Sequence, residues 1–183
     1  MRVVIDACVL YPTVLREIVL GVASRGGFVP VWSPRILEEW ARAAERVDAG
    51  AQTIARGEIA LLRSAFPQAQ VTPPADIEAM LQLPDPADTH VLAAAIAAGA
   101  AVILTFNLRD FPRRALDPHG LRAQHPDAFL MALWLDRPEI VVQAVREARA
   151  RTEQVSGRAQ PLRPLLKRAK LPRLGKALQS DES

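Results

Sequence analysis

Four acidic residues that are far apart in the sequence each fall beside a predicted strand end or helix start. Asp6 and Asp110 follow short apolar runs, whereas Glu39 and Asp88 lie near the starts of predicted helices. In an open α/β sheet, strands end and helices begin at the same edge, so we expect the four carboxylates to converge there. Carboxylates gathered without Lys or Arg repel one another unless a cation neutralises them, and hard oxygen ligands select Mg²⁺ or Mn²⁺. Such a metal can lower the pKa of a bound water and clamp a phosphodiester during in-line attack.

The segment from Leu83 to Pro112 is predicted to position two of these acids. Asp85 suits the N-cap of a helix, Pro86 its first position, and Asp88 its third position. Gly99 ends that helix, and the apolar run 101–104 that follows is predicted to be a buried parallel strand. Asn107 and Asp110 then lie in the loop after the strand. The segment is therefore predicted to be a helix–strand unit with acids at both ends.

Helix capping is the plain alternative for each acid. It accounts well for Asp85 alone, and Asp6 could likewise cap a helix after the first strand, Arg2 to Ile5. Capping accounts less well for Asp88, because helical periodicity puts Asp88 in the middle of the core-facing arc formed by Val91, Leu92 and Ala95. An acid on such an arc needs compensation, since an unpaired buried charge is costly.

The neighbouring acids Glu38 and Glu39 are separated by their helix register. Ser33 is predicted to cap this helix, with Pro34 at its first position. Glu39 lies at the border of the inner arc, whereas Glu38 lies on the far side of the helix. We therefore expect Glu39 to reach inward and Glu38 to face water. A lone border Glu is more often a surface charge, which is the alternative for Glu39.

The remaining periodicity alternates strands with helices, which indicates an α/β fold with three layers (α/β/α) and a mostly parallel central sheet. Asp76 is expected to cap a short helix that runs to Leu83, and a brief strand is expected at Gln70-Val71. We predict one domain over residues 1–135 and a C-terminal helical, basic extension over 136–183. Other helices are predicted over 13–24, 34–47, 51–65 and 136–151, and another strand over 28–32.

Composition sets limits on the class of protein. The chain has 183 residues, half of them apolar, which is enough for a sizeable core. Its one cysteine, Cys8, excludes a disulfide framework and a cysteine-based zinc site, and is expected to be a packed residue rather than a nucleophile. The apolar run before Asp6 has only three residues, Val3 to Ile5, and no run approaches membrane-spanning length. We therefore expect a cytoplasmic protein with no signal peptide and no membrane partner.

Charge is unevenly distributed along the chain. From Arg146 to the end, ten Lys and Arg face four Asp and Glu, a balance of +6; the rest has thirteen against sixteen, a balance of −3. A basic C-terminal segment suits attraction to a polyanion, although such a segment is often only a solvated face. Its leucines predict short helices that dock on the body, rather than a free tail.

Several motifs together resemble the PIN-domain family, which includes VapC-like toxin ribonucleases. The resemblance spans about Arg2 to Leu135, and its last two motifs are the specific ones. It rests on Val4-Ile5-Asp6, on Ser33 to Trp40, on LPDPADTHVLAAAI and on VILTFNLRDFP.

The resemblance implies a PIN-like fold and a Mg²⁺- or Mn²⁺-dependent endoribonuclease, the toxin of a bacterial toxin–antitoxin pair. Its catalytic residues would be Asp6, Glu39, Asp88 and Asp110; the first, third and fourth would bind the metal. Asp85, Thr105 and Asn107 would be supporting polar groups. Some family members have an acid near the last motif where this chain has Asn107, so the number of metals stays open. RNA, an antitoxin protein and a second copy of the chain are the implied partners.

Other functions compete with this interpretation. A phosphotransferase with an Asp nucleophile would also place Asp6 after the first strand, but the haloacid-dehalogenase pattern wants a second Asp where this chain has Cys8. A response-regulator receiver wants a lysine at a strand end facing the acids, and residues 102–107 contain none. A catalytically weak or inactive PIN-like module that binds RNA or a partner is the main alternative.

The basic C-terminal segment is predicted to contact RNA. Its cations would offset the repulsion between phosphates and the acidic site, and they would touch phosphates rather than bases, which adds affinity without sequence preference. The alternative is that the segment grips a partner protein or a second subunit. The residues predicted to bind RNA are Arg163, Lys167, Arg168 and Lys170.

Overall fold

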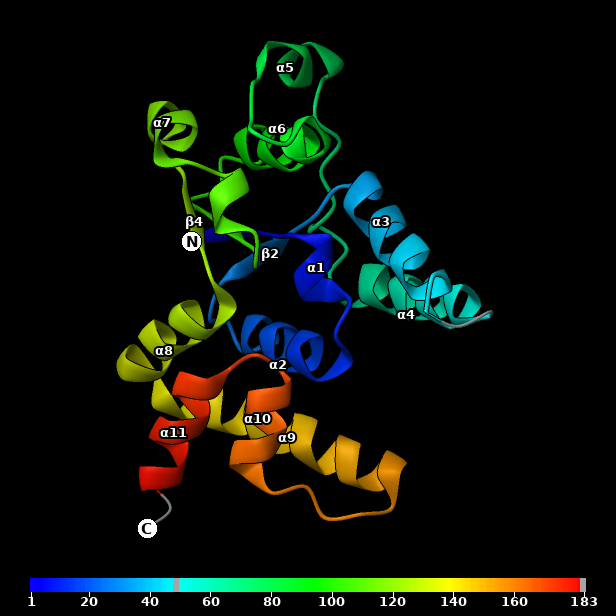
Figure 1. The fold of residues 1–183 in the computed structure, drawn as a ribbon, viewed down its shortest axis with the longest axis vertical. Helices are drawn as coiled ribbons and strands as arrows, with labels where there is room; N and C mark the ends of the chain where they lie inside the picture. The colour runs from blue at the N-terminus through cyan, green and yellow to red at the C-terminus, as the bar shows by residue number, and fades with distance from the viewer. Residues whose placement is uncertain (48–49, 182–183) are drawn as a thin grey trace. The chain divides into compact units, whose positions relative to one another are not determined.

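Parallel pairing joins four short strands of the chain into one sheet, in the order β2-β1-β3-β4 (Figure 1). The computed structural model describes residues 1–47 and 50–181. In the register, Val4 of β1 lies between Val31 of β2 and Ile103 of β3, and Ile103 pairs in turn with Ala123 of β4. The strands are β1 (Arg2–Ile5), β2 (Val29–Val31), β3 (Val102–Leu104) and β4 (Arg122–Gln124). The predicted α/β fold with a parallel central sheet is confirmed.

The edge strand β4 was not predicted from the sequence. Its residues Arg122 to Gln124 are polar or small, and none is fully buried. Backbone pairing to β3, supported by the Thr105 N–H donating to the Gln124 carbonyl at 3.0 Å, defines the strand instead. The apolar runs that do predict strands belong to the central strands, whose residues Val3 to Ile5 and Val102 to Leu104 have no exposed surface.

The chain divides into two compact units. The sheet unit contains residues 1–11 and 29–124, and the helical unit contains residues 12–28 and 125–183. Residues 12–28 and 125–135 thus group with the C-terminal helices. The domain boundary predicted after Leu135 stays a prediction.

Helices flank the sheet within the sheet unit, and α3 packs closely along α4 (Figure 1). Ser33 caps α3 as predicted, since its Oγ accepts the Ile36 N–H at 3.2 Å. The helices of this unit are α1 (Ala7–Leu10), α3 (Pro34–Glu45), α4 (Ala51–Ala65), α5 (Ala75–Met80), α6 (Thr89–Ala97) and α7 (Arg113–Leu116). Short 3-10 turns lie at η1 (Pro86–Asp88), η2 (Leu108–Asp110) and η3 (Asp117–His119).

Helix α6 is buried nearly all round. Residues Thr89 to Ala95 are all buried, so this helix has no solvated face on which a polar side chain could lie. The helix ends as predicted at Gly99, which has φ of +58°, a left-handed conformation that glycine adopts without strain.

Two expectations about helix starts in this unit are wrong. Asp76 does not cap α5; Pro74 occupies the cap position, and the helix ends at Met80 rather than Leu83. Asp88 is not the third residue of an α-helix. Asp85 does cap this segment as predicted, with its carboxylate accepting the Ala87 N–H at 2.9 Å and Pro86 first, but residues 86–88 form the 3-10 turn η1, and Asp88 occupies the N-cap position of α6. The brief strand expected at Gln70-Val71 is an isolated bridge between Gln70 and Trp32.

The helical unit is built from α2 and the C-terminal helices. Helix α2 packs on α9, α10 on α11, and α11 on α8. Five leucines of the basic segment are buried, as the prediction of docked helices requires, and Leu162 is partly exposed; the buried ones are Leu165, Leu166, Leu171, Leu174 and Leu178. The helices are α2 (Thr13–Ser24), α8 (Pro126–Asp136), α9 (Pro138–Ser156), α10 (Leu162–Arg168) and α11 (Pro172–Asp181). Among the described helices of both units, none is long and apolar enough to cross a bilayer.

Candidate acidic active site

Asp6 lies at the end of β1 and is 5% exposed. Its backbone N–H donates to the Leu104 carbonyl at 3.1 Å, which fixes it beside the end of β3. Two side chains donate to its Oδ2 atom: the Thr105 hydroxyl at 2.7 Å and the Cys8 thiol at 3.2 Å. Thr105 is fully buried and accepts the Asn107 backbone N–H at 3.0 Å. Thr105, through its hydroxyl, and Asn107, through its backbone N–H, thus form a chain of hydrogen bonds that leads to Asp6.

Asp88 carries the clearest electrostatic signature of the site. Burial raises the pKa of its carboxyl to about 6, and the nearby charges of Asp6, Asp85, Asp110 and Glu39 add to this increase. In the part of the chain that the structure describes, no Lys or Arg forms an ion pair with Asp6 or Asp88. The structure therefore brings the four predicted acids and Asp85 into one negative environment at the carboxyl edge of the sheet.

Glu39 and Glu38 have different partners, although their side chains are equally exposed at 36% and 35%. Glu39 Oε1 lies 2.9 Å from His90 Nε2 and 3.6 Å from Arg35 Nε. It is also one of the charges that act on Asp88. Glu39 therefore reaches the acidic site, as its helix register predicted.

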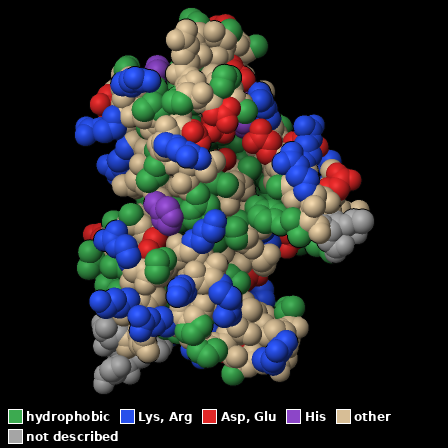
Figure 2. Space-filling view, in the orientation of Figure 1, with side chains coloured by type: hydrophobic (Ala, Val, Ile, Leu, Met, Phe, Trp, Pro, Cys, Tyr) green, Lys and Arg blue, Asp and Glu red, His purple; other side chains and the backbone are tan. Residues whose placement is uncertain are grey.

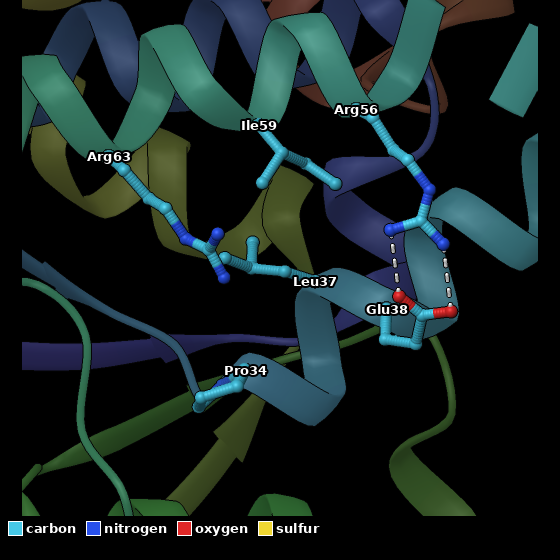
Figure 3. A pocket seen from close by; sticks show the side chains of 6 residues that line it. All are labelled: Pro34, Leu37, Glu38, Arg56, Ile59 and Arg63. Atoms are coloured by element: carbon cyan, nitrogen blue, oxygen red, sulfur yellow. Dashed lines mark hydrogen bonds and ion pairs between the residues drawn. The ribbon is translucent and has the colours of Figure 1, made fainter. Parts of the chain in front are cut away.

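Glu38 is held on the other side of α3. It accepts two hydrogen bonds from the Arg56 guanidinium, both at 3.1 Å, and one from Arg42 at 3.2 Å. These arginines lower the pKa of Glu38. Figure 3 shows the fork between Arg56 and Glu38 at a pocket between α3 and α4, lined by Pro34, Leu37, Glu38, Arg56, Ile59 and Arg63. None of the four predicted acids lines this pocket, and its acid is already neutralised.

Asp110 and Asp85 lie at the margin of the site. Asp110 ends the turn η2 with its side chain 21% exposed, and the Nε of Arg109 is 4.0 Å away. The Arg109 side chain is 94% exposed, so this pair is weak in water. Asp85 is exposed and caps η1. Its charge still acts on Asp88, so the capping interpretation and the electrostatic one both hold for Asp85.

Cys8 is half-buried beside Asp6. Burial and the Asp6 charge raise the pKa of its thiol to about 12. A thiol in this state is not a nucleophile at neutral pH, which agrees with the expectation of a packed residue.

Sequence reasoning missed His90. Its ring is 2% exposed on α6, two residues after Asp88, and its Nε2 contacts Glu39. The sequence did hold a clue to its burial. After Thr89 and His90 the helix THVLAAAIA contains only apolar residues, so it offers no polar face on which the histidine could lie.

The carboxylate oxygens of the site suit a hard divalent cation, but they do not yet form a complete metal-binding site. Figure 2 shows Asp and Glu side chains gathered on one face of the sheet unit, near α6 and the start of α3. Within residues 1–47 and 50–181, no group of three His, Cys, Asp or Glu side chains is close enough to hold a metal ion. The pKa of Asp88 is raised partly because the surrounding carboxylates are negatively charged, and a bound cation would neutralise that charge.

Comparison with known proteins agrees with the family resemblance. Residues 2–109, more than half of the chain, match the family described as PIN domain. A 44-residue stretch is 54% identical to "Putative ribonuclease VapC50" of Mycobacterium tuberculosis (strain ATCC 25618 / H37Rv), covering 24% of this chain and 26% of that protein. The aligned stretch thus spans about a quarter of that relative's length. No solved structure matches the chain.

Proposed function

Because this chain belongs to the PIN domain family, whose members are typically nucleases, we propose that it is a metal-dependent endoribonuclease that hydrolyses RNA phosphodiester bonds. The partial similarity to a VapC protein supports RNA as the substrate. It also supports the narrower proposal of a toxin acting in the cytoplasm with a cognate antitoxin. A homodimer is a further proposal.

The observation that carries the proposal is geometric: acids from the end of β1, from α3 and from the loop after β3 converge on Asp88. Four other carboxylates act on it, and no Lys or Arg among the described residues pairs with it. A cluster of this kind attracts a cation, and PIN domains generally use divalent metals.

Each residue has a proposed task. Asp6, Asp88 and Asp110 would hold Mg²⁺ or Mn²⁺, which when bound supplies an activated water and a clamp for the phosphate. Glu39 would complete the catalytic site from α3. Thr105 holds the Asp6 carboxylate through its hydroxyl, and the Asn107 backbone N–H in turn holds the Thr105 oxygen. Asp85 fixes the turn that carries Asp88.

The test is cleavage of a mixed RNA pool by the metal-free protein after addition of Mg²⁺ or Mn²⁺. The protein should cleave RNA with metal and not with EDTA. Asp6→Asn and Asp88→Asn should each lower the cleavage rate at least about 100-fold, because each removes a proposed metal ligand. Asp117→Asn, an exposed acid paired with Arg113 on η3, is the matched control and should stay near wild-type. Equal rates in all four proteins would contradict the proposal.

One observation favours a second candidate, a catalytically weak or inactive module that binds RNA or a partner. The acids are not assembled as a complete metal site in the described residues. RNA binding without metal-dependent cleavage would favour this candidate. Formation of a phosphoenzyme would instead favour a phosphotransferase.

We further propose that the basic segment binds RNA phosphates. Four of its cations, Arg163, Lys167, Arg168 and Lys170, are exposed, while the leucines between them are buried. Burial of the leucines fixes α10, which carries three of the charges, and the turn after it, which carries Lys170, and all four side chains reach the surface.

Changing these four cations to Gln should weaken RNA binding and flatten its salt dependence, by up to about one unit of slope for each phosphate that no longer meets a cation. A matched control changes four exposed arginines of the sheet unit, Arg42, Arg46, Arg56 and Arg63, to Gln. If RNA affinity and the slope of its salt dependence fall equally in both variants, RNA binding depends on the net charge of the protein and not on the basic segment. Unchanged RNA affinity with loss of a dimer or partner complex would favour the protein-binding alternative.

A further inference from the structure

His90 is buried without a well-directed hydrogen bond. It is 2% exposed, and neither ring nitrogen has a hydrogen-bond partner among the described residues. Its Nε2 lies 2.9 Å from Glu39 Oε1, within ion-pair distance, although this contact does not meet hydrogen-bond geometry. The Glu39 carboxylate is thus the polar group that faces the buried Nε2 atom.

A buried polar ring of this kind costs stability when its nitrogens lack partners. An apolar side chain of the same size would avoid that cost, so packing alone does not explain why an imidazole occupies this position. The group that faces Nε2 is a carboxylate of the acidic site. The ring therefore points from the rigid, buried helix α6 toward the one proposed catalytic residue that α3 supplies.

Glu39 also has a competing partner on its solvent side. Arg35 lies one turn earlier on α3, with its Nε 3.6 Å from the same Oε1 atom. Arg35 is 51% exposed and also pairs with Glu78 of α5 at 2.9 Å. An exposed arginine attracts the Glu39 carboxylate toward solvent, whereas His90 contacts it from the buried side. The Glu39 carboxylate thus lies between a buried inner contact and an exposed outer one.

We propose that His90 is a positioning residue that holds the Glu39 carboxylate toward Asp88 against the attraction of Arg35. This proposal rests on the proposed function, because Glu39 is taken as part of the metal-dependent site, where its negative charge acts on Asp88 and so adds to the attraction for the cation. It predicts that His90 acts on the metal and the reaction only through Glu39. Groups that orient metal-site carboxylates in this way typically change affinity or activity by about 10- to 100-fold when removed.

The test compares His90→Met, which keeps the volume of the side chain, with His90→Gln, which keeps a donor near the position of Nε2. His90→Met should lower Mn²⁺ affinity in calorimetric titration, and kcat for RNA cleavage, by about 10-fold, with KM for RNA unchanged. His90→Gln should recover most of both losses. The thermal midpoint of metal-free His90→Met should not fall, because the variant removes an unsatisfied buried ring. A purely structural histidine would instead lose stability and activity together.

A double variant tests whether His90 acts only through Glu39. His90→Met added to Glu39→Gln should cause no further loss of Mn²⁺ affinity or kcat, because the carboxylate that His90 positions is already gone. Independent losses that multiply would overturn the proposal, as would wild-type Mn²⁺ affinity and kcat in His90→Met.

Failure of the proposed function gives a different pattern. If the wild-type protein cleaves no RNA, Mn²⁺ affinity still decides the role of His90. If it also binds no Mn²⁺, a double-variant cycle on metal-free unfolding decides whether His90 and Glu39 interact; absence of coupling there overturns the positioning proposal.

Discussion

Two buried acids of this chain, Asp127 in the helical unit and Asp6 in the sheet unit, are almost equally exposed at 4% and 5%, and they have opposite surroundings. Asp127 accepts the backbone N–H groups of Arg173 and Leu174, one on each oxygen, at 2.9 and 3.0 Å. It thereby caps the start of α11. Asp6 receives a hydroxyl and a thiol on one oxygen and shares its surroundings with Asp88 and other carboxylates.

The difference shows that burial alone does not mark a functional acid. Asp127 satisfies a helix end and is itself satisfied, so its charge is used within the fold. Asp6 and Asp88 add negative charge to a place that already holds several. A buried acid that accepts backbone N–H groups, as Asp127 does, stabilises the protein. A buried acid among other carboxylates, as in the site of Asp6 and Asp88, lowers stability until a cation binds.

After the losses expected for Asp6→Asn and Asp88→Asn, the next largest effect separates the two neighbouring glutamates. Glu39→Gln should reduce RNA cleavage about 10- to 100-fold, because Glu39 acts within the acidic site, whereas Glu38→Gln should change it less than about twofold. Both side chains are about one-third exposed, so the pair is matched for solvent contact. The measurement is the single-turnover rate at saturating Mg²⁺. Equal losses of cleavage rate in the two variants would mean that Glu39 has no role in the acidic site that Glu38 lacks.

The next effect concerns Asp127. Asp127→Ala should lower the free energy of unfolding by about 2–3 kcal/mol, because two backbone N–H groups lose a charged acceptor. Chemical denaturation measures the loss, and hydrogen exchange should place it in α11. Asp127→Asn should lose less, since its amide oxygen still accepts one hydrogen bond. A stability gain in Asp127→Ala would remove the contrast with Asp88.

A smaller effect follows from the pKa of Asp88. This pKa is raised from 3.8 to about 6 in the folded protein, so the folded state binds the proton more tightly than the unfolded state. The resulting stability is fully present below pH 3.8 and is lost as the pH rises through about 6. Water screens this half-buried carboxyl, so the loss should be about 1 kcal/mol. Urea denaturation in EDTA at about pH 4.5 and about pH 7 should show the loss in wild-type, and a smaller one in Asp88→Asn.

The sequence predicted the sheet edge well because that edge depends on local patterns. Apolar runs predict β1 and β3, and Ser33 with Pro34 predicts the start of α3. Positions of Asp6, Glu39 and Asp110 relative to those elements then follow from the geometry of a parallel sheet. Asp88 lies at the predicted edge, but in the 3-10 turn η1 that precedes α6 rather than in the first turn of an α-helix, because helical periodicity does not distinguish the two kinds of turn.

Pairings between distant residues could not be predicted. Asp127 and Arg173 are 46 residues apart, and no local pattern links a carboxylate at the start of α8 to the N–H groups of α11. His90 and Glu39 meet only because α3 and α6 both begin at the sheet edge. The edge strand β4 has no apolar run, so only its pairing with β3 reveals it. Such features arise from tertiary packing rather than from local propensity.

The central claim is that Asp88 belongs to a cation site and is not a structural cap. Its most direct test is the free energy of unfolding of wild-type and Asp88→Asn at about pH 7, each measured in EDTA and with excess Mn²⁺. Without metal, Asp88→Asn should be more stable than wild-type by about 1 kcal/mol, because one of several repelling charges is gone. With Mn²⁺, wild-type should gain stability in proportion to the logarithm of metal concentration, and Asp88→Asn should gain much less. A metal-free Asp88→Asn that is less stable than wild-type, with an equal Mn²⁺ effect in both proteins, would contradict the claim.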